Sequence, residues 1–239
     1  MLILSLDTSS PAGSIAILRD ENIVGEISTS TQEAYSTRIF RHLDFLLREL
    51  SLNLDSFDLF AVAAGPGSFT GLRVGLTAAK AWAEAYGKPV AAVSALEAIA
   101  AQSRSSARLL VPVLDAKRGE VYFGFYKRSV DANSAELALD GAECSASPDE
   151  FFNTLNARAD IAEAAIVTST PEVLAAGAAS RGEKSAPRIE RVSSVLAPEI
   201  GRIGLRHARS GKLFDALTLD AHYVRRSDAE VQWKGIPGS

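Results

Sequence analysis

The feature that most constrains the fold of this chain is a pattern that occurs twice. Residues 2–7, LILSLD, form an apolar run that ends in aspartate, and residues 109–115, LLVPVLD, have the same form. Each run is followed by a short turn and by a second strand-like segment, GSIAILR at 13–19 and GEVYFGFYKR at 119–128. Internal repetition of this kind indicates a fold built from two copies of one unit.

Both halves continue with the same order of elements. Short apolar runs with β-branched residues predict strands, and apolar residues spaced three or four apart predict helices. In each half the order is three strands, followed by helix, strand, helix, strand and helix. The further predicted elements are strands at 22–29, 59–64, 90–93, 135–139, 164–169 and 188–193, and helices at 36–50, 69–86 and 197–209, with others starting at Ser94, Ser147 and Thr170.

This order is that of the ribonuclease-H-like domain, which is duplicated in the actin-like ATPases (the ASKHA class). We therefore expect an α/β protein in which each copy forms a mixed five-stranded sheet with flanking helices. The expected boundaries are an N-terminal domain at 1–105, a C-terminal domain at 106–211 and a partly disordered tail at 212–239.

Composition excludes several classes of protein. The chain has 239 residues, of which 47% are hydrophobic, which is enough for one or two small cores. Its net charge of −4 gives no overall basic footprint for nucleic acid. Cys144 is the single cysteine, so no internal disulfide forms and a reducing compartment is expected. With no signal-peptide pattern and no apolar run that spans a bilayer, we expect a cytoplasmic protein.

Two aspartates are the candidates for a nucleotide site. Asp7 and Asp115 occupy matching strand ends, where kinases of this fold hold Mg²⁺–ATP or place a base. With Arg118 they would form a vestigial nucleotide cleft. However, the strand at 164–169 leads into Thr170 and proline rather than into a glycine-rich adenosine-binding turn. The alternative is that each aspartate ends a strand and accepts hydrogen bonds from turn amides.

Other catalytic patterns are missing from the sequence. The histidines His42, His207 and His222 form no pair one helical turn apart, which a typical metal site would need. No G-x-S-x-G motif is present, and Cys144 has no histidine nearby in the sequence. Serine, cysteine and metallopeptidase chemistry are therefore disfavoured.

Two helices carry residues that do not fit a simple core pattern. In the helix at 36–50, Phe45 falls beside Arg38 and His42, on a face that should be solvated, which suggests contact with another chain. A single exposed phenylalanine without function is the alternative. In the helix at 69–86, glycine recurs one turn apart, which costs roughly 1 kcal/mol per residue against alanine and indicates close approach of a helix or subunit.

Three segments resemble the TsaB family of tRNA threonylcarbamoyladenosine biosynthesis proteins, also described as glycoprotease-like or peptidase M22-like. They are LILSLDTSS at the N-terminus, AAGPGSFTGLRVGLTAAKAWA at 63–83 and LDAKRGEVYFGFY at 114–126, with a weaker echo in YVRR at 223–226. The resemblance covers the N-terminal half nearly throughout and the first strands of the second half.

The resemblance implies an accessory role without catalysis. The related catalytic subunit, TsaD, carries a metal-binding HxxxH on a helix whose counterpart here, STRIFRHLDFLLREL, lacks that pair. TsaB-like proteins pair with TsaD through their N-terminal domains, and TsaE, a P-loop ATPase, joins them. The assembly transfers a threonylcarbamoyl group to the adenosine next to the anticodon of tRNA. We therefore expect no cofactor on this chain, with ATP and metal on the partner subunits.

The expected partner interface combines the two helices described above. In isolation the same surface would form a homodimer, and no membrane contact is expected. Two alternatives remain: an ATP-dependent small-molecule kinase or ATPase, based on the paired aspartates, and the disfavoured metallopeptidase. The interface residues expected are Arg38, His42, Phe45, Gly71, Gly75 and Ala79.

Overall fold

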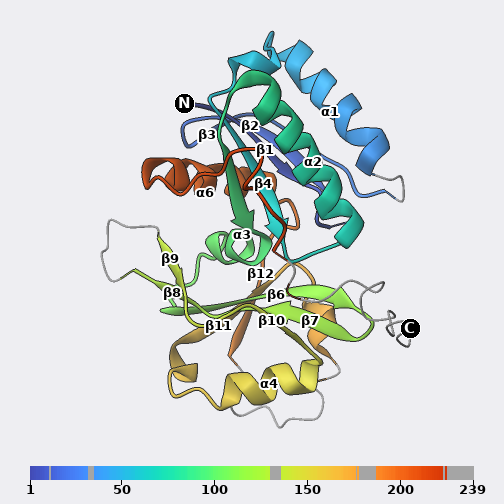
Figure 1. Ribbon diagram of the computed structural model, residues 1–239. Helices are drawn as coiled ribbons and strands as arrows, with labels where there is room; N and C mark the ends of the chain where they lie inside the picture. The colour runs from blue at the N-terminus through green and yellow to red at the C-terminus, as the bar shows by residue number, and fades with distance from the viewer. Residues whose placement is uncertain are drawn as a thin grey trace, which may run out of the picture.

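The chain forms two lobes, each built around its own sheet (Figure 1). The computed structural model describes residues 1–10, 12–31, 35–129, 136–175, 177, 187–222 and 224. Both sheets are mixed and flanked by helices, and this confirms the predicted duplicated α/β fold. The expected disorder near the C-terminus concerns mainly residues 225–239, which lie outside the described residues.

The sheet of the N-terminal lobe has the strand order β3-β2-β1-β4-β5. The first three strands are antiparallel neighbours, whereas β1, β4 and β5 run parallel to one another. The apolar strands β1 and β4 are buried at every position and lie in the centre, and the more polar β3 lies at the edge. The bounds are β1 Leu2–Asp7, β2 Ser14–Arg19, β3 Asn22–Ser28, β4 Leu59–Gly65 and β5 Val90–Ser94.

Helices cover both faces of this sheet. Helix α1 (Tyr35–Glu49) and helix α2 (Phe69–Tyr86) share one apolar cluster with one face of the sheet. The predicted ends of α2 are confirmed, because the Ser68 hydroxyl accepts the Gly71 N–H and Gly87 closes the helix with a left-handed φ of 62°. The opposite face packs against α3 (Ala95–Ala101) and α6 (Ala197–Arg209).

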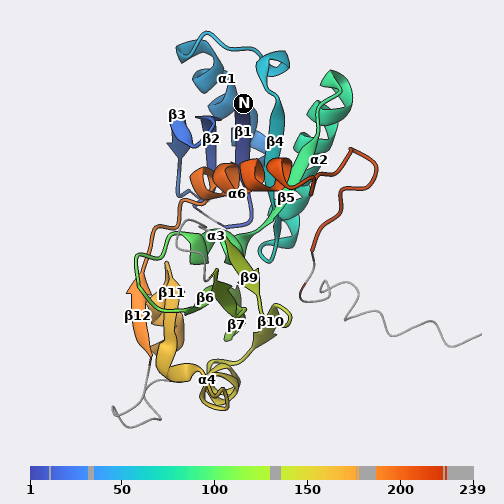
Figure 2. The same cartoon turned by 90° about the vertical axis from the view of Figure 1, so that its left-hand side faces the viewer.

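The position of α6 differs from the sequence-based assignment. Residues 197–209 were placed in the C-terminal domain, whereas α6 lies across strands of the N-terminal sheet (Figure 2). Its glycines permit this close approach, since a Cβ atom on Gly204 would lie 2.7 Å from the Cβ of Ala61. The last helix of the second half therefore completes the core of the first lobe.

The sheet of the C-terminal lobe repeats this order in β10-β7-β6-β11-β12, but its described residues form seven strands instead of the expected five, because β8 and β9 are added beside this path. The single strand predicted at 119–128 is divided into β7 and β8, which pair with opposite ends of β6. On the outer side of this bent strand, β10 pairs with β7 and β9 pairs with β8. Two short strands therefore take the place of the single third strand that was predicted. The bounds are β6 Leu109–Lys117, β7 Glu120–Phe123, β8 Tyr126–Arg128, β9 Leu137–Leu139, β10 Cys144–Ala146, β11 Ala164–Thr168 and β12 Arg188–Arg191.

The helix at the foot of the C-terminal lobe begins as predicted. Helix α4 (Pro148–Asn156) has a complete capping box between Ser147 and Glu150. The helix expected to start at Thr170 begins with a 3-10 turn at Pro171–Leu174, and Ala175 and Gly177 beyond it are helical. The rest of that segment lies outside the described residues. Further 3-10 turns lie at Leu54–Ser56 and Ile161–Glu163.

Candidate interlobe cleft and partner surface

A cavity of about 620 Å³ lies between the two lobes. Its walls come from the loop after β1, the start of α2, the hairpin after β6, the loop after β11 and the C-terminal segment. Such a position, where loops from two lobes converge, is the usual place for a ligand in α/β folds. Polar or charged residues on the walls include Ser9, Ser10, Ser68, Asp115, Lys117, Arg118, Ser169, Thr170 and His222.

Asp7 holds the loop behind this cavity. Its side chain is fully buried, and one carboxylate oxygen accepts the Ser9 N–H at 2.8 Å and the Ser9 hydroxyl at 2.6 Å. Burial raises the pKa of Asp7, while these hydrogen bonds act in the opposite direction. The carboxylate is thus engaged in shaping the loop that carries Ser9 and Ser10 to the cavity.

Asp115 occupies the matching turn of the second copy, and its side chain lines the cavity. Its carboxylate accepts the Lys117 N–H at 2.7 Å and pairs with the Lys117 ammonium at 2.6 Å. Arg118 follows with a left-handed φ of 57° and also lines the cavity. The structure therefore brings Asp115 and Arg118 together on one wall, and both aspartates accept turn amides, as the alternative interpretation predicted.

Phe45 lies on the solvent-facing side of α1, as predicted. Its exposed fraction is 55%, whereas Ile39, Leu43 and Leu46 on the opposite side of the helix are buried. Phe40, which was not predicted as a surface residue, is 56% exposed and packs edge-on against Trp82 of α2 with ring centroids 6.4 Å apart. On a helical wheel Phe40 falls beside Leu47, at the edge of the apolar stripe, so spacing alone does not separate it from the core.

The structure corrects the assignment of Arg38 to a surface. Arg38 is only 1% exposed. Its guanidinium donates to the Thr29 carbonyl oxygen at 2.8 Å and hydroxyl at 2.7 Å, and lies over the Tyr35 ring at 4.1 Å. The residue ties the segment after β3 to the start of α1. Its long apolar stem allows this burial, and its charge had suggested the opposite.

The small residues of α2 are also internal. A Cβ atom on Gly71 would overlap the Thr8 carbonyl oxygen, and one on Gly75 would overlap the Thr8 hydroxyl. Ala79 is fully buried. These three residues let α2 pack against the end of β1 within the same chain, so they are corrected from surface to core positions. His42, which is partly exposed, and Phe45 stay candidates for partner contact.

Within the described part of the chain, no group of three or more His, Cys, Asp or Glu residues is arranged to hold a metal ion. None of the helices described there is both long and apolar enough to cross a membrane.

The model of the TsaD family, described as tRNA N6-adenosine threonylcarbamoyltransferase, matches residues 22–174, which is more than half of the chain. The chain belongs to this family. Similar proteins include TsaB, "tRNA threonylcarbamoyladenosine biosynthesis protein TsaB", from Bacillus subtilis (strain 168), 39% identical over 53% of this chain and 56% of that protein. The TsaB of Escherichia coli (strain K12) is 32% identical over 54% and 56%. The TsaB resemblance is thus confirmed, and the alignments span little more than half of these relatives.

A solved structure supports the fold over nearly the whole chain. It is an uncharacterized protein with similarity to peptidase YEAZ from Pseudomonas aeruginosa, with a TM-score of 0.75. The superposition covers 94% of this chain and 99% of that one, at 24% sequence identity. At this identity the match shows a common fold, and it covers both lobes.

Proposed function

We propose that the chain takes part in tRNA threonylcarbamoyladenosine biosynthesis as a non-catalytic subunit. In this role it pairs with a TsaD-like catalytic subunit, a TsaE-like ATPase joins the assembly, and tRNA is reached through the complex in the cytoplasm. ATP and metal would be held by the partner subunits. The observation that carries the proposal is the pair of exposed aromatic side chains, Phe40 and Phe45, on α1 beside α2.

The surface formed by these two side chains has the character of a protein interface. Each is more than half exposed, while the same helix buries an ordinary apolar stripe on its other side. Aromatic residues are enriched at the centres of interfaces, where a few of them supply most of the binding energy. The exposed charged residues Arg41 and Asp44 lie between them on the outward face of α1, so the surface is an aromatic pair with charged residues at its centre. A second copy of the chain would cover the same surface when the catalytic subunit is absent.

The decisive experiment replaces Phe45 with glutamate. We expect Phe45→Glu to weaken binding to the TsaD-like subunit by about 30-fold or more, because interface aromatics commonly contribute 2 kcal/mol or more. Co-elution and tRNA modification in a reconstituted system would both fall. The melting temperature should stay near that of the native chain, since Phe45 is already exposed.

The matched control is Leu217→Glu, which places the same charge at an 89% exposed apolar side chain away from α1. It should bind and support modification like the native chain. A Phe45→Glu variant that still co-elutes and restores modification fully would refute the proposed interface.

The interlobe cavity favours one second candidate, an ATP-dependent small-molecule kinase or ATPase. Asp115 and Arg118 line the cavity, whereas Asp7 is buried behind Ser9 and serves the loop. We expect no ATP turnover above background, and no change on Asp115→Ala. Turnover by the native chain that is lost in Asp115→Ala would support the kinase instead.

A further inference from the structure

The segment after α6 continues along the N-terminal lobe (Figure 2), and His222 and Val224 near its end line the cavity. We call residues 213–222 the C-terminal strap. Phe214 pairs with Val90 at the edge of β5 through hydrogen bonds of 2.8 and 2.9 Å. Leu219 is buried in the core of the lobe, and the His222 N–H donates to the Ala64 carbonyl at 2.8 Å. The strap is therefore anchored along its length to one lobe.

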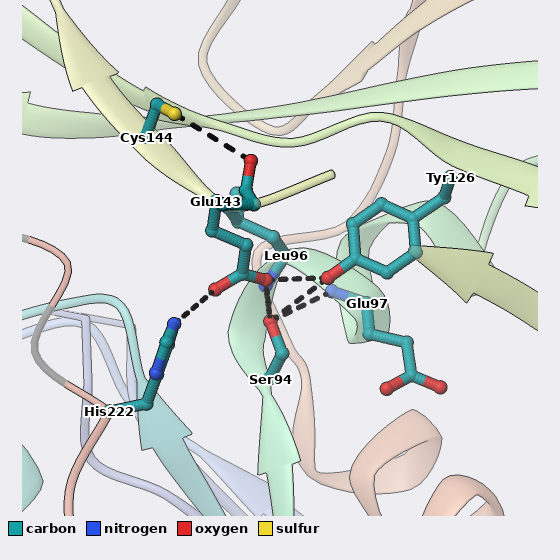
Figure 3. Close-up of polar contacts among 8 residues, drawn as sticks. Ser94, Leu96, Glu97, Tyr126, Glu143, Cys144 and His222 are labelled. Atoms are coloured by element: carbon teal, nitrogen blue, oxygen red, sulfur yellow. Dashed lines mark hydrogen bonds and ion pairs between the residues drawn. The ribbon is translucent and has the colours of Figure 1, made fainter. Parts of the chain in front are cut away.

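At its end, the strap meets a buried carboxylate from the other lobe (Figure 3). Glu143, in the loop between β9 and β10, has a side chain that is only 2% exposed. One of its oxygens accepts hydrogen bonds from the hydroxyls of Tyr126, at 2.5 Å, and Ser94. Its other oxygen lies 3.3 Å from Nε2 of His222. Glu143 thus joins both lobes and the strap.

The contacts that Glu143 makes with Ser94 and Tyr126 are harder to break than its contact with His222. Ser94 also caps α3, where it accepts the Leu96 and Glu97 N–H groups at 3.1 and 3.2 Å, and Tyr126 is buried. Breaking these contacts would leave a buried carboxylate and a buried hydroxyl without partners, which is unfavourable. The His222 side chain is 61% exposed, so water reaches this contact, and it breaks before the buried contacts of Ser94 and Tyr126 do. The lobes are held firmly, whereas the strap end is releasable.

The strap end is also a wall of the interlobe cavity. His222 lines the cavity, and so does Val224 just beyond it. The backbone carbonyl of His222 lies so close to Gly65 that a side chain there would overlap it. The lack of a side chain at Gly65 therefore lets this end of the strap pack against the turn between β4 and α2.

We propose that the C-terminal strap is a latch on the interlobe cavity, held closed by the contact between Glu143 and His222. When this contact is made, the end of the strap forms one wall of the cavity. When it breaks, residues 220–222 move away from the turn between β4 and α2 and the cavity loses this wall, while the contacts of Glu143 with Ser94 and Tyr126 keep the lobes in place.

The first test measures amide hydrogen exchange in the full chain by mass spectrometry. His222→Ala should speed exchange in residues 219–222 by about tenfold or more, because it removes the contact that holds this end. Exchange in β1 and β4 should be unchanged. The control Leu217→Ala alters an exposed side chain of the same strap and should leave exchange at 219–222 as in the native chain.

The second test reports on the cavity itself. In a Cys144→Ser background, which removes the native exposed thiol, Ser169→Cys places a thiol on the cavity wall, in the loop after β11. Maleimide labelling of this thiol should be about tenfold faster with His222→Ala, and unchanged with Leu217→Ala. Native rates of exchange and labelling in His222→Ala would overturn the latch, and would mean that Phe214 and Leu219 alone hold the strap. Faster exchange throughout the N-terminal lobe would overturn it also, since His222 would then support the fold.

Discussion

At the scale of single residues, burial decides what a charged side chain does in this chain. Arg38 and Phe45 were assigned to the same surface from their spacing on one helix. The structure separates them, because the long arginine side chain folds inward to Thr29 while the phenylalanine stays 55% exposed. Spacing fixes the direction of a Cβ atom, but the path of a long side chain depends on acceptors supplied by other segments.

Glu97 gives a prediction at this scale. Burial raises its pKa to about 7, Arg206 opposes the shift and the charge of Glu143 adds to it. A carboxyl with a raised pKa in the folded state stabilises the fold when protonated, and this stability is lost as pH rises from about 4.5 through 7. Glu97→Gln mimics the protonated form at every pH. Its melting temperature should therefore exceed that of the native chain increasingly between pH 5 and 8.

The gain in stability at pH 8 should be about 1–3 kcal/mol, measured by thermal unfolding across this range. It is limited by the loss of the favourable Arg206 interaction. A difference between variant and native chain that does not vary with pH would show that Glu97 is already ionised without cost in the fold.

At the scale of elements, local sequence patterns predicted where the strands and helices lie. They did not predict what each face of a helix packs against. The two glycines of α2 correctly indicated a close approach of backbone. From the sequence they were assigned to the contact with a partner subunit, and this was wrong, because their neighbour is Thr8 of the same chain. Similarly, the segment predicted as one strand at 119–128 bends and forms both β7 and β8. This bend depends on pairing with both ends of β6.

Helix α2 therefore gives a prediction about stability. Gly71→Ala and Gly75→Ala should each lower the free energy of unfolding by about 1–3 kcal/mol, because the added methyl group overlaps Thr8 and outweighs the gain in helix propensity. Thr77→Ala, an exposed position of the same helix, is the control and should change it by less than about 0.5 kcal/mol. Denaturant unfolding measures all three. Gly75→Leu should unfold the chain, and a stable Gly75→Leu would contradict the internal packing.

At the scale of the whole molecule, the two halves of the sequence do not correspond to two independent cores. Helix α6 covers one face of the N-terminal sheet, with Ile200 and Ile203 buried against it, and Leu219 of the strap fills the core on the other face. Both come from the far end of the chain. The boundary expected at residue 105 lies between the strands of the two sheets, but α6 and the strap, which come after it, pack on the first lobe.

A fragment test follows from this arrangement. Residues 1–105 expressed alone should lack a cooperative unfolding transition, since the sheet would expose the apolar face that α6 covers. Joining residues 195–222 to this fragment through a flexible linker should restore the transition and a dispersed NMR spectrum. Cooperative folding of 1–105 by itself would mean that the N-terminal half is an independent domain, as the repeat in the sequence suggested.

The sequence by itself determined the duplicated topology, the bounds of α2, the start of α4 at Ser147 and the solvent-facing position of Phe45. All of these depend on periodicity and local turn chemistry, which act over a few residues. Only the tertiary structure decided that Gly71 and Gly75 face Thr8, that α6 crosses to the first lobe, and that Glu143 meets Ser94, Tyr126 and His222. Those contacts join residues far apart in the chain, and burial and hydrogen-bond pairing select them only when the whole molecule is packed.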